Sequence, residues 1–219
     1  MMITQTSCRI LSLKKEKLTI CEQKIGAEKA VVIIPEIYGI NQYIKDWANF
    51  FKHQGYDSYC VDLSGRNHVY RYAESDRAYD NFMMEVGLDR YKEIAVNVEK
   101  LKDHYKKIII FGSSVGATIA WRLTANRCCD GMIGYYGSRI RDYLAINPVC
   151  LCLLIFPELE KSFEVQSIIP KLGQKDRVET FIVPGKHGFA DPYGKDFSEL
   201  SRNRGLDMVK YFLRKIEDQ

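Results

Sequence analysis

Residues 107–116, Lys-Ile-Ile-Ile-Phe-Gly-Ser-Ser-Val-Gly, decide the fold of this chain. The first half is a short β-branched apolar run, which is typical of a buried strand. The second half has the form Gly-x-Ser-x-Gly, and residues 117–123 continue it with a segment that can form a helix. A strand, a sharp turn and a helix in this order are the context of a nucleophile elbow, whose serine projects above the sheet. Glycine is needed at both ends of the turn because a side chain there would collide with the neighbouring strand or helix. The stretch therefore predicts Ser114 as a nucleophile.

Strand and helix patterns alternate on both sides of this elbow. Further strands are predicted at residues 30–34, 56–61, 132–136, 150–156 and 178–183, and helices at 41–54, 88–105, 117–126 and 197–216. A short hairpin of residues 7–12 and 17–21 precedes them, and residues 64–86 are expected to begin as a loop. Strands that alternate with helices favour a mostly parallel sheet covered by helices on both faces. We therefore expect one α/β domain over residues 1–219, with the hairpin as an antiparallel edge.

The composition argues against several classes of protein. Hydrophobic residues make up 46% of the 219 residues, an ordinary globular value. The net charge is +4 and the basic residues are scattered, so we expect no nucleic-acid partner. No apolar run approaches 18 residues, which predicts no membrane partner. Residues 1–11 lack the apolar core of a signal peptide, and we expect a cytoplasmic protein.

The cysteines and histidines predict neither a disulfide framework nor a metal site. The seven cysteines include no Cys-x-x-Cys pair, and their number is odd. We expect them to be small buried hydrophobic residues; Cys150 and Cys152 lie two apart on a predicted strand and so share one face. The four histidines have no spacing that suits a metal, so no metal or other cofactor is expected.

A serine nucleophile requires a base, and His187 is the best candidate. A serine hydroxyl is a poor nucleophile until a base takes its proton and a third group orients that base. His187 follows the last predicted strand, between Gly185 and Gly188, which let the backbone turn back across the strand ends. The other histidines lie on or beside predicted helices or in a polar loop. The pattern thus predicts His187 as the general base.

Carboxylates follow two of the predicted strands. The acid that orients the base is expected after the strand that precedes the last one, where Glu158, Glu160 and Glu164 compete. Glu36 follows the strand 30–34, in the loop that supplies the first oxyanion-hole N–H in folds with such an elbow. The second N–H would come from Val115, directly after the nucleophile. We expect Glu36 to belong to the site.

Four motifs, in order, resemble the dienelactone hydrolase family. They are Pro-Glu-Ile-Tyr-Gly-Ile-Asn at 35–41, the elbow at 112–116, Tyr-Tyr-Gly at 135–137 and His-Gly-Phe at 187–189. Together they cover most of the chain, from about residue 30 to 190. The resemblance implies an α/β-hydrolase fold without a large lid. It also implies hydrolysis of esters or lactones with no metal.

The resemblance assigns roles to particular residues. Ser114 stands where the family usually has a nucleophilic cysteine, and His187 matches the family's histidine. Glu36 matches a glutamate that contacts the nucleophile. Ile37 and Val115 match the residues whose amides form the oxyanion hole.

The chain also departs from the family pattern. The family's Gly-x-x-Asp reads Pro157-Glu-Leu-Glu160 here, so Glu160 takes the place of the aspartate. Two residues after His-Gly, where the founding enzymes carry an arginine for a substrate carboxylate, this chain has Ala190-Asp191. Arg71 is the candidate for a second substrate-binding arginine, and Tyr38 is also predicted to contact the substrate.

We expect a serine hydrolase that cleaves a small ester or lactone through an acyl-enzyme. Ser114 attacks, His187 moves the proton, Glu160 orients His187, and the amides of Ile37 and Val115 hold the oxyanion. Two alternatives stay open: an acyl thioesterase, and a degenerate hydrolase that acts as a binding protein. A small-molecule ester or lactone is the expected partner, and the protein is expected to be a monomer or a homodimer.

Overall fold

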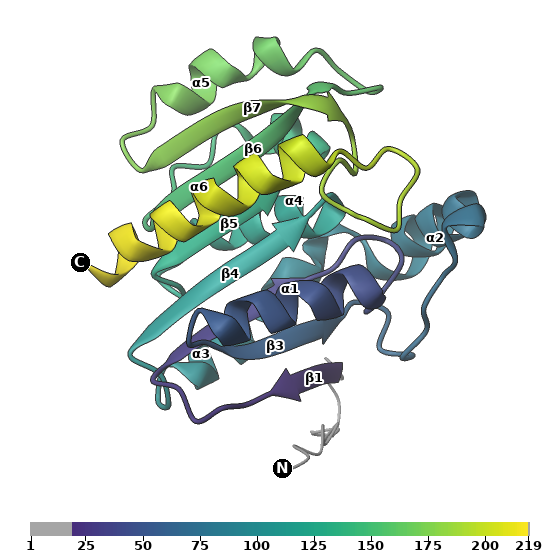
Figure 1. Ribbon diagram of the computed structural model, residues 1–219. Helices are drawn as coiled ribbons and strands as arrows, with labels where there is room; N and C mark the ends of the chain where they lie inside the picture. Colours follow the sequence, from purple (N-terminus) through teal and green to yellow (C-terminus); the bar gives the residue numbers. More distant parts are fainter. Residues whose placement is uncertain (1–18, 219) are drawn as a thin grey trace.

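The computed structural model describes residues 19–218, which form a sheet covered by helices on both faces (Figure 1). The sheet contains seven strands in the order β1-β3-β2-β4-β5-β6-β7. Their bounds are Thr19–Gln23 (β1), Lys29–Ile34 (β2), Asp57–Asp62 (β3), Lys107–Ser113 (β4), Gly131–Tyr135 (β5), Leu151–Leu159 (β6) and Val178–Lys186 (β7). β1 pairs with β3 in the antiparallel sense and every other pair is parallel. The predicted α/β fold with a mostly parallel sheet and an antiparallel edge is confirmed. The first half of the predicted hairpin lies outside the described residues.

The helices divide into two layers. α1 (Gln42–His53) and α6 (Glu199–Glu217) cover one face of the sheet, while α3 (Tyr91–Leu101) and α4 (Val115–Leu123) cover the other (Figure 1). Shorter helical segments are η1 (Tyr72–Glu74), α2 (Ser75–Asn81), η2 (Phe82–Val86), η3 (Leu88–Arg90), η4 (Ser138–Tyr143), η5 (Val165–Ser167) and α5 (Ile169–Gly173). In the described part of the chain, no helix combines the length and the apolar character needed to cross a membrane.

Each face of the sheet contributes to its own apolar core. Trp47 of α1 and Phe212 of α6 pack on one face, with Ile33 and Phe111 from the central strands. Trp121 of α4 lies in the core of the other face. Because β2 and β4 are covered on both sides, their side chains are buried almost without interruption. This is why the two strands read as continuous apolar runs rather than as alternating ones.

The local signals at helix ends hold in the structure. The Asn41 side chain accepts a hydrogen bond from the N–H of Ile44 and caps α1, and Gly55, with φ of 80°, follows its end. Gly205 lies within α6, where a Cβ would come 2.6 Å from the Tyr135 hydroxyl. The helix packs closely on the sheet at this point, and a larger residue at position 205 would displace the Tyr135 side chain.

The structure differs from the predictions in two segments: the helix predicted over 88–105 is shorter, and the loop expected at 64–86 contains short helices. The amphipathic pattern over 88–105 begins as the 3-10 turn η3, and α3 itself ends at Leu101. Residues 64–86 do begin without regular structure, but η1, α2 and η2 follow from Tyr72 onward. These short segments lie beyond the ends of the parallel strands (Figure 1). Within α2 and η2 the buried residues are Ala78 and Phe82. Two buried residues do not produce the repeated apolar spacing by which a longer helix is recognised in a sequence.

Candidate active site

The elbow is as sharp as the sequence indicates. Ser114 links β4 to α4 with φ of 53° and ψ of −120°, a conformation that a non-glycine residue rarely adopts. A Cβ at position 112 would lie 2.4 Å from the carbonyl oxygen of Gly116, and one at position 116 would lie 2.2 Å from that of Ile34. The backbone therefore admits only glycine at these two positions, and Ser114 projects beyond the end of the sheet.

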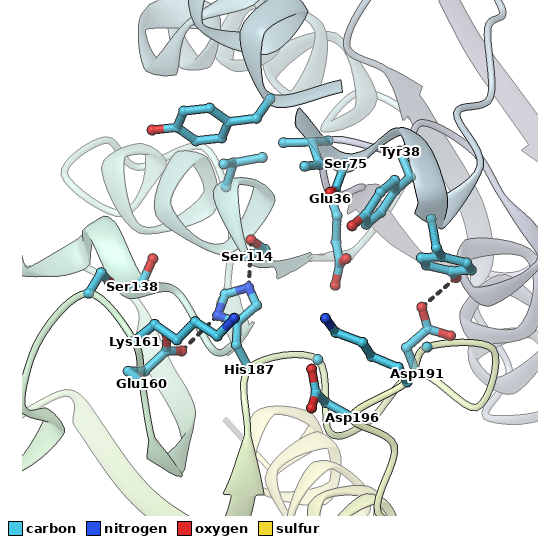
Figure 2. A pocket seen from close by; sticks show the side chains of 18 of the residues that line it. Glu36, Tyr38, Ser75, Ser114, Ser138, Glu160, Lys161, His187, Asp191 and Asp196 are labelled. Carbon is cyan, nitrogen blue, oxygen red and sulfur yellow. Dashed lines mark hydrogen bonds and ion pairs between the residues drawn. The ribbon is translucent and has the colours of Figure 1, made fainter. Parts of the chain in front are cut away.

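Three predicted residues form one hydrogen-bonded line at this edge (Figure 2). Nδ1 of His187 lies 2.7 Å from Oε1 of Glu160, and Nε2 lies 3.0 Å from Oγ of Ser114. Each residue directly follows a strand: Ser114 follows β4, Glu160 follows β6 and His187 follows β7. Because the carboxyl ends of parallel strands meet at one edge, residues far apart in the sequence come together there.

Of the three glutamates that the sequence left open, Glu160 is the one hydrogen-bonded to His187. The pairing of β6 with β7 shifts in register between Pro157 and Leu159, so that Leu159 lies opposite Lys186. Glu160 and His187, the residues that follow these two, therefore come together where the strands end. Glu158 and Glu164 are exposed, whereas only 3% of the Glu160 side chain is accessible.

The surroundings of His187 favour its protonated form. Burial lowers the pKa of His187. The hydrogen bond with Glu160 and the charge of Glu160 raise this pKa, and the charge of Glu36 raises it by a smaller amount. Together these effects outweigh burial, so the pKa lies above its ordinary value. With the Nδ1 proton donated to the carboxylate of Glu160, the lone pair of Nε2 faces Ser114 and accepts its hydroxyl proton. The arrangement can hold a proton that leaves Ser114.

Glu36 points into the same space as Ser114 and His187 (Figure 2). Burial raises the pKa of its carboxyl, the charge of His187 lowers it in part, and Asp191 adds to the rise. Among the described residues, Oε1 of Glu36 is buried and has no hydrogen-bond partner. The Glu36 carboxyl is thus more ready to hold a proton than a surface glutamate.

The two residues predicted to supply oxyanion-hole amides flank the serine. Ile37 follows Glu36 beyond β2, and Val115 is the first residue of α4. Both line a cavity of about 690 Å³ together with Ser114 and His187. A first helical residue has no N–H partner within its own helix, so the N–H of Val115 has none within α4. Their role in catalysis stays a prediction.

The cavity has walls of different chemistry. Tyr38, Tyr72, Ala73 and Tyr79 line it on the side of η1 and α2. Four basic residues line it elsewhere; these are Arg139, Arg141, Lys161 and Lys195. Tyr38 is half-buried, and its ring meets that of Tyr72 edge-on, with centroids 4.8 Å apart. The structure thus places Tyr38 at the cavity, and its contact with a substrate stays a prediction.

Arg71 does not line this cavity. Its guanidinium pairs with Glu74, and its side chain is 84% exposed. The structure instead places Arg139 and Arg141 of η4 at the cavity, and sequence reasoning missed both. A signal existed, because η4 comes shortly after a strand, at the edge of the sheet where the site lies. Contact between Arg71 and a substrate stays a prediction.

Sequence reasoning also missed two contacts that fix the site. The Tyr72 hydroxyl donates a hydrogen bond to the carboxylate of Asp191 and accepts one from the Asn41 side chain at 3.1 Å. Asp191 is 2% exposed and also accepts a hydrogen bond from the N–H of Tyr193. Its burial raises its pKa. This pair joins the segment η1–α2 to the loop that carries His187.

Tyr136 supports the other side of His187. The two ring centroids lie 4.9 Å apart, and the Tyr136 hydroxyl is 2.8 Å from that of Tyr43 in α1. Tyr136 has a φ of 39°, which is unusual for a residue with a side chain. The Tyr-Tyr-Gly motif therefore contributes a buried ring against the imidazole. Among the described residues, no group of three or more His, Cys, Asp or Glu side chains is arranged to hold a metal ion.

Comparison with known proteins shows the family of this chain. The model of the dienelactone hydrolase family matches residues 18–217, almost the whole chain. This chain belongs to the dienelactone hydrolase family. The resemblance read from the four motifs is confirmed, including the α/β-hydrolase fold.

Relatives of this family member differ in how far they have been characterised. The uncharacterized protein YczH of Bacillus subtilis (strain 168) is 36% identical over 182 residues, which are 82% of this chain and 90% of that protein. Carboxymethylenebutenolidase 1 of Cupriavidus pinatubonensis (strain JMP 134 / LMG 1197) is 23% identical over 185 residues, 78% of this chain and 79% of that protein. Among solved structures, the dienelactone hydrolase-like promiscuous phosphotriesterase P91 from metagenomic libraries matches with a TM-score of 0.72 and 14% identity, covering 88% of each chain. At that identity the match shows a shared fold.

Proposed function

We propose that this member of the dienelactone hydrolase family is a serine hydrolase that cleaves a small carboxylic ester or lactone through an acyl-enzyme. The observation that carries the proposal is the hydrogen-bonded line from Glu160 through His187 to Ser114, at the base of a cavity of about 690 Å³. A nucleophile, a base and an orienting carboxylate in this order activate a serine at neutral pH.

The first half of the reaction forms the acyl-enzyme. Oγ of Ser114 attacks the carbonyl carbon while Nε2 of His187 takes the hydroxyl proton. The Glu160 carboxylate, bonded to Nδ1, stabilises the imidazolium that results. The N–H groups of Ile37 and Val115 donate hydrogen bonds to the oxyanion. His187 then returns the proton to the leaving oxygen as the ester bond breaks.

The second half releases the acid. Water enters the cavity, loses a proton to Nε2 of His187 and attacks the acyl carbon, and Ser114 leaves with the proton that His187 returns. Glu36 lies beside this site. Burial raises the pKa of its carboxyl, so it holds a proton to higher pH than a surface glutamate does.

The names of relatives support an ester or lactone as the substrate class. The related carboxymethylenebutenolidase of Cupriavidus pinatubonensis is named for a butenolide, which is an unsaturated lactone. The present chain has Ser114 where the family has cysteine and Ala190-Asp191 where the founding enzymes have arginine. We therefore propose a substrate other than dienelactone itself.

A fluorophosphonate probe tests the proposal directly. Such probes bond covalently to a serine whose proton is taken by a neighbouring base. The folded protein should be labelled at Ser114, and the Ser114→Ala variant should not. Ser167→Ala, which removes an exposed serine of η5, is the matched control and should be labelled like the wild type.

A substrate panel decides between the remaining candidates. Aryl esters, lactones and acyl thioesters should be offered to protein of the same batch that has not been treated with the probe, and esters or lactones should be hydrolysed with the highest kcat/KM. Preference for thioesters would identify an acyl thioesterase. Folded protein that neither takes the probe nor hydrolyses any substrate would identify a binding protein and refute the proposal.

A further inference from the structure

Four cysteines gather at the edge of the sheet opposite to Ser114. Cys128 and Cys129 lie shortly before β5. Cys150 directly precedes β6, and Cys152 is the second residue of that strand. All four side chains are buried in the core that α3 and α4 cover. They lie at the amino ends of these strands, whereas the candidate catalytic residues lie at the carboxyl ends. The proposed hydrolase mechanism therefore makes no use of them.

The sulfurs of Cys129 and Cys150 are in contact across two neighbouring strands. The Sγ atoms lie 3.6 Å apart, although 20 residues separate the two positions in the chain. β5 and β6 are neighbours, with Gly131 opposite Leu151, so the residues just before each strand lie side by side. A disulfide needs an S–S distance of about 2.0 Å, so the two sulfurs must approach one another for the bond to form.

The pair is close to solvent. Cys129 is 8% exposed and Cys150 is 5% exposed. Asp130 and Val149, the residues beside them, are both exposed. The thiols therefore lie at the rim of the core, beside exposed residues.

The two sulfurs differ in their hold on a proton. The hydrogen bond with Cys129 is the main cause that lowers the pKa of the Cys150 thiol, and Cys152 contributes in the same direction. The hydrogen bond with Cys128 is the main cause that raises the pKa of the Cys129 thiol, and the hydrogen bond with Cys150 and burial add to the rise. A thiolate next to a protonated thiol is the arrangement in which one sulfur attacks an oxidant and the other completes a disulfide.

We propose that Cys129 and Cys150 form a redox-active dithiol, which a hydroperoxide converts into an intramolecular disulfide. The Cys150 thiolate attacks one oxygen of the hydroperoxide, the O–O bond breaks, and the leaving oxygen takes up a proton to give an alcohol or water. The sulfur of Cys129 then attacks the resulting sulfenic acid, the S–O bond breaks, and hydroxide leaves as water with the Cys129 proton. Two thiols are oxidised and one hydroperoxide is reduced.

The cross-link would stabilise the fold and leave the candidate active site in place. It would join the amino ends of β5 and β6 and close the segment between them, which carries η4. Closing a loop of this kind restricts the unfolded chain, so the oxidised protein should unfold at a temperature higher by roughly 3–10 °C. This inference stands independently of the proposed hydrolase activity.

Hydrogen peroxide on the wild-type chain is the primary test. After acid quenching, alkylation under denaturing conditions and digestion with trypsin, the peptide of residues 128–139 should be found joined to that of residues 142–161. The joined mass should be about 2 Da below the sum of the two peptides, because two hydrogens are lost. Fragment ions should place the bond between Cys129 and Cys150. Dithiothreitol should restore both peptides and the lower unfolding temperature.

An exposed methionine gives the test an internal measure of dose. Met84 is 81% exposed, and the disulfide should form at a lower peroxide concentration than its sulfoxide. The proposal is overturned if both thiols are still alkylated once Met84 is fully oxidised. It is equally overturned if Cys150 ends as a sulfinic acid without a link, or if the bond joins Cys128 to Cys129.

Matched variants confirm which sulfurs react. The double variant Cys128→Ser/Cys152→Ser keeps the proposed pair and should form the same cross-link. Cys129→Ser and Cys150→Ser should each abolish it, and a cross-link between the same two peptides in either variant would contradict the proposal. The wild-type mapping decides the question by itself if a variant does not fold.

Discussion

The two sides of the cavity are built in different ways. Ser114, Glu160 and His187 each directly follow a strand of the sheet, and neighbouring strands fix the backbone that carries them. The opposite wall comes from η1 and α2, which lie outside the sheet (Figure 1). Along the chain these two segments come after β3 and before α3. That segment buries little and leaves Tyr79 43% exposed.

The difference shows which part of the cavity needs exact atomic positions. Proton transfer between Ser114 and His187 depends on hydrogen-bond distances that strand ends can hold to fractions of an ångström. Contact with the rest of a substrate tolerates more movement, and a peripheral segment can supply it. The hydrogen bond from Tyr72 to Asp191 ties the second wall to the first. Substitutions on the two sides should therefore differ in the kind of defect and in its size.

Ser114→Ala should produce the largest effect. It removes the attacking oxygen, so kcat for an ester should fall by about 10⁴-fold or more while the unfolding temperature changes little. Steady-state kinetics with an aryl acetate and thermal unfolding by circular dichroism measure both. Activity that persists at the wild-type level would eliminate Ser114 as the nucleophile and direct attention to Ser113 or a cysteine.

Glu160→Gln should come next. Glutamine cannot stabilise the imidazolium as a carboxylate does, so kcat should fall by about 10²–10⁴-fold with KM little changed. Glu158→Gln and Glu164→Gln are matched controls, because both side chains are exposed, and each should change kcat by less than about tenfold. A large fall in either control with a mild effect at Glu160 would show that another carboxylate orients His187.

Tyr72→Phe should affect the second wall with a smaller loss. Asp191 and Asn41 each lose a hydrogen-bond partner, which should lower the free energy of unfolding by about 1–2 kcal/mol. We expect kcat/KM to fall by roughly three- to tenfold, mainly through KM, because the wall that receives the substrate loosens. Denaturant unfolding and kinetics on the same ester provide the measurement. A fall in kcat as large as that of Glu160→Gln would remove the distinction between the two walls.

The pH profile should separate the two walls most finely. Only neutral His187 can accept a proton from Ser114, and the pKa of His187 is raised, so activity should be lost as the pH falls through a value above 6.5. Glu160→Gln removes the charge that raises this pKa, so the residual activity should persist to lower pH. Tyr72→Phe should leave the acid limb where it is in the wild type. Plots of kcat/KM against pH for the three proteins test this, and an unmoved limb in Glu160→Gln would contradict the assignment.

The sequence predicted the parts of the fold that depend on local patterns. The continuous apolar runs of β2 and β4 required two covered faces, and the glycines around Ser114 required a sharp turn. The helix start at Asn41 rests on a side chain that bonds within its own segment. Each of these signals lies within a few neighbouring residues, so the sequence contains it directly.

Contacts between distant segments were beyond this kind of reasoning. The sequence left three glutamates near the end of β6 as candidates for the acid that orients His187. The register shift against β7 brings Glu160 to His187. The cavity takes Arg139 and Arg141 rather than Arg71, which pairs with Glu74 beside it. No local pattern announces the bond between Tyr72 and Asp191, whose positions are 119 residues apart.

The sequence by itself determined that this chain forms an α/β hydrolase of the dienelactone hydrolase family, with a serine at the elbow and a histidine after the last strand. Strand periodicity, glycine placement and short motifs are local properties, and each is readable without knowledge of the rest of the chain. The tertiary structure alone decided which carboxylate meets His187, which side chains form the second wall, and that the sulfurs of Cys129 and Cys150 lie 3.6 Å apart. These outcomes depend on strand register and on the packing of distant segments, where a shift of one residue would turn a side chain to the other face.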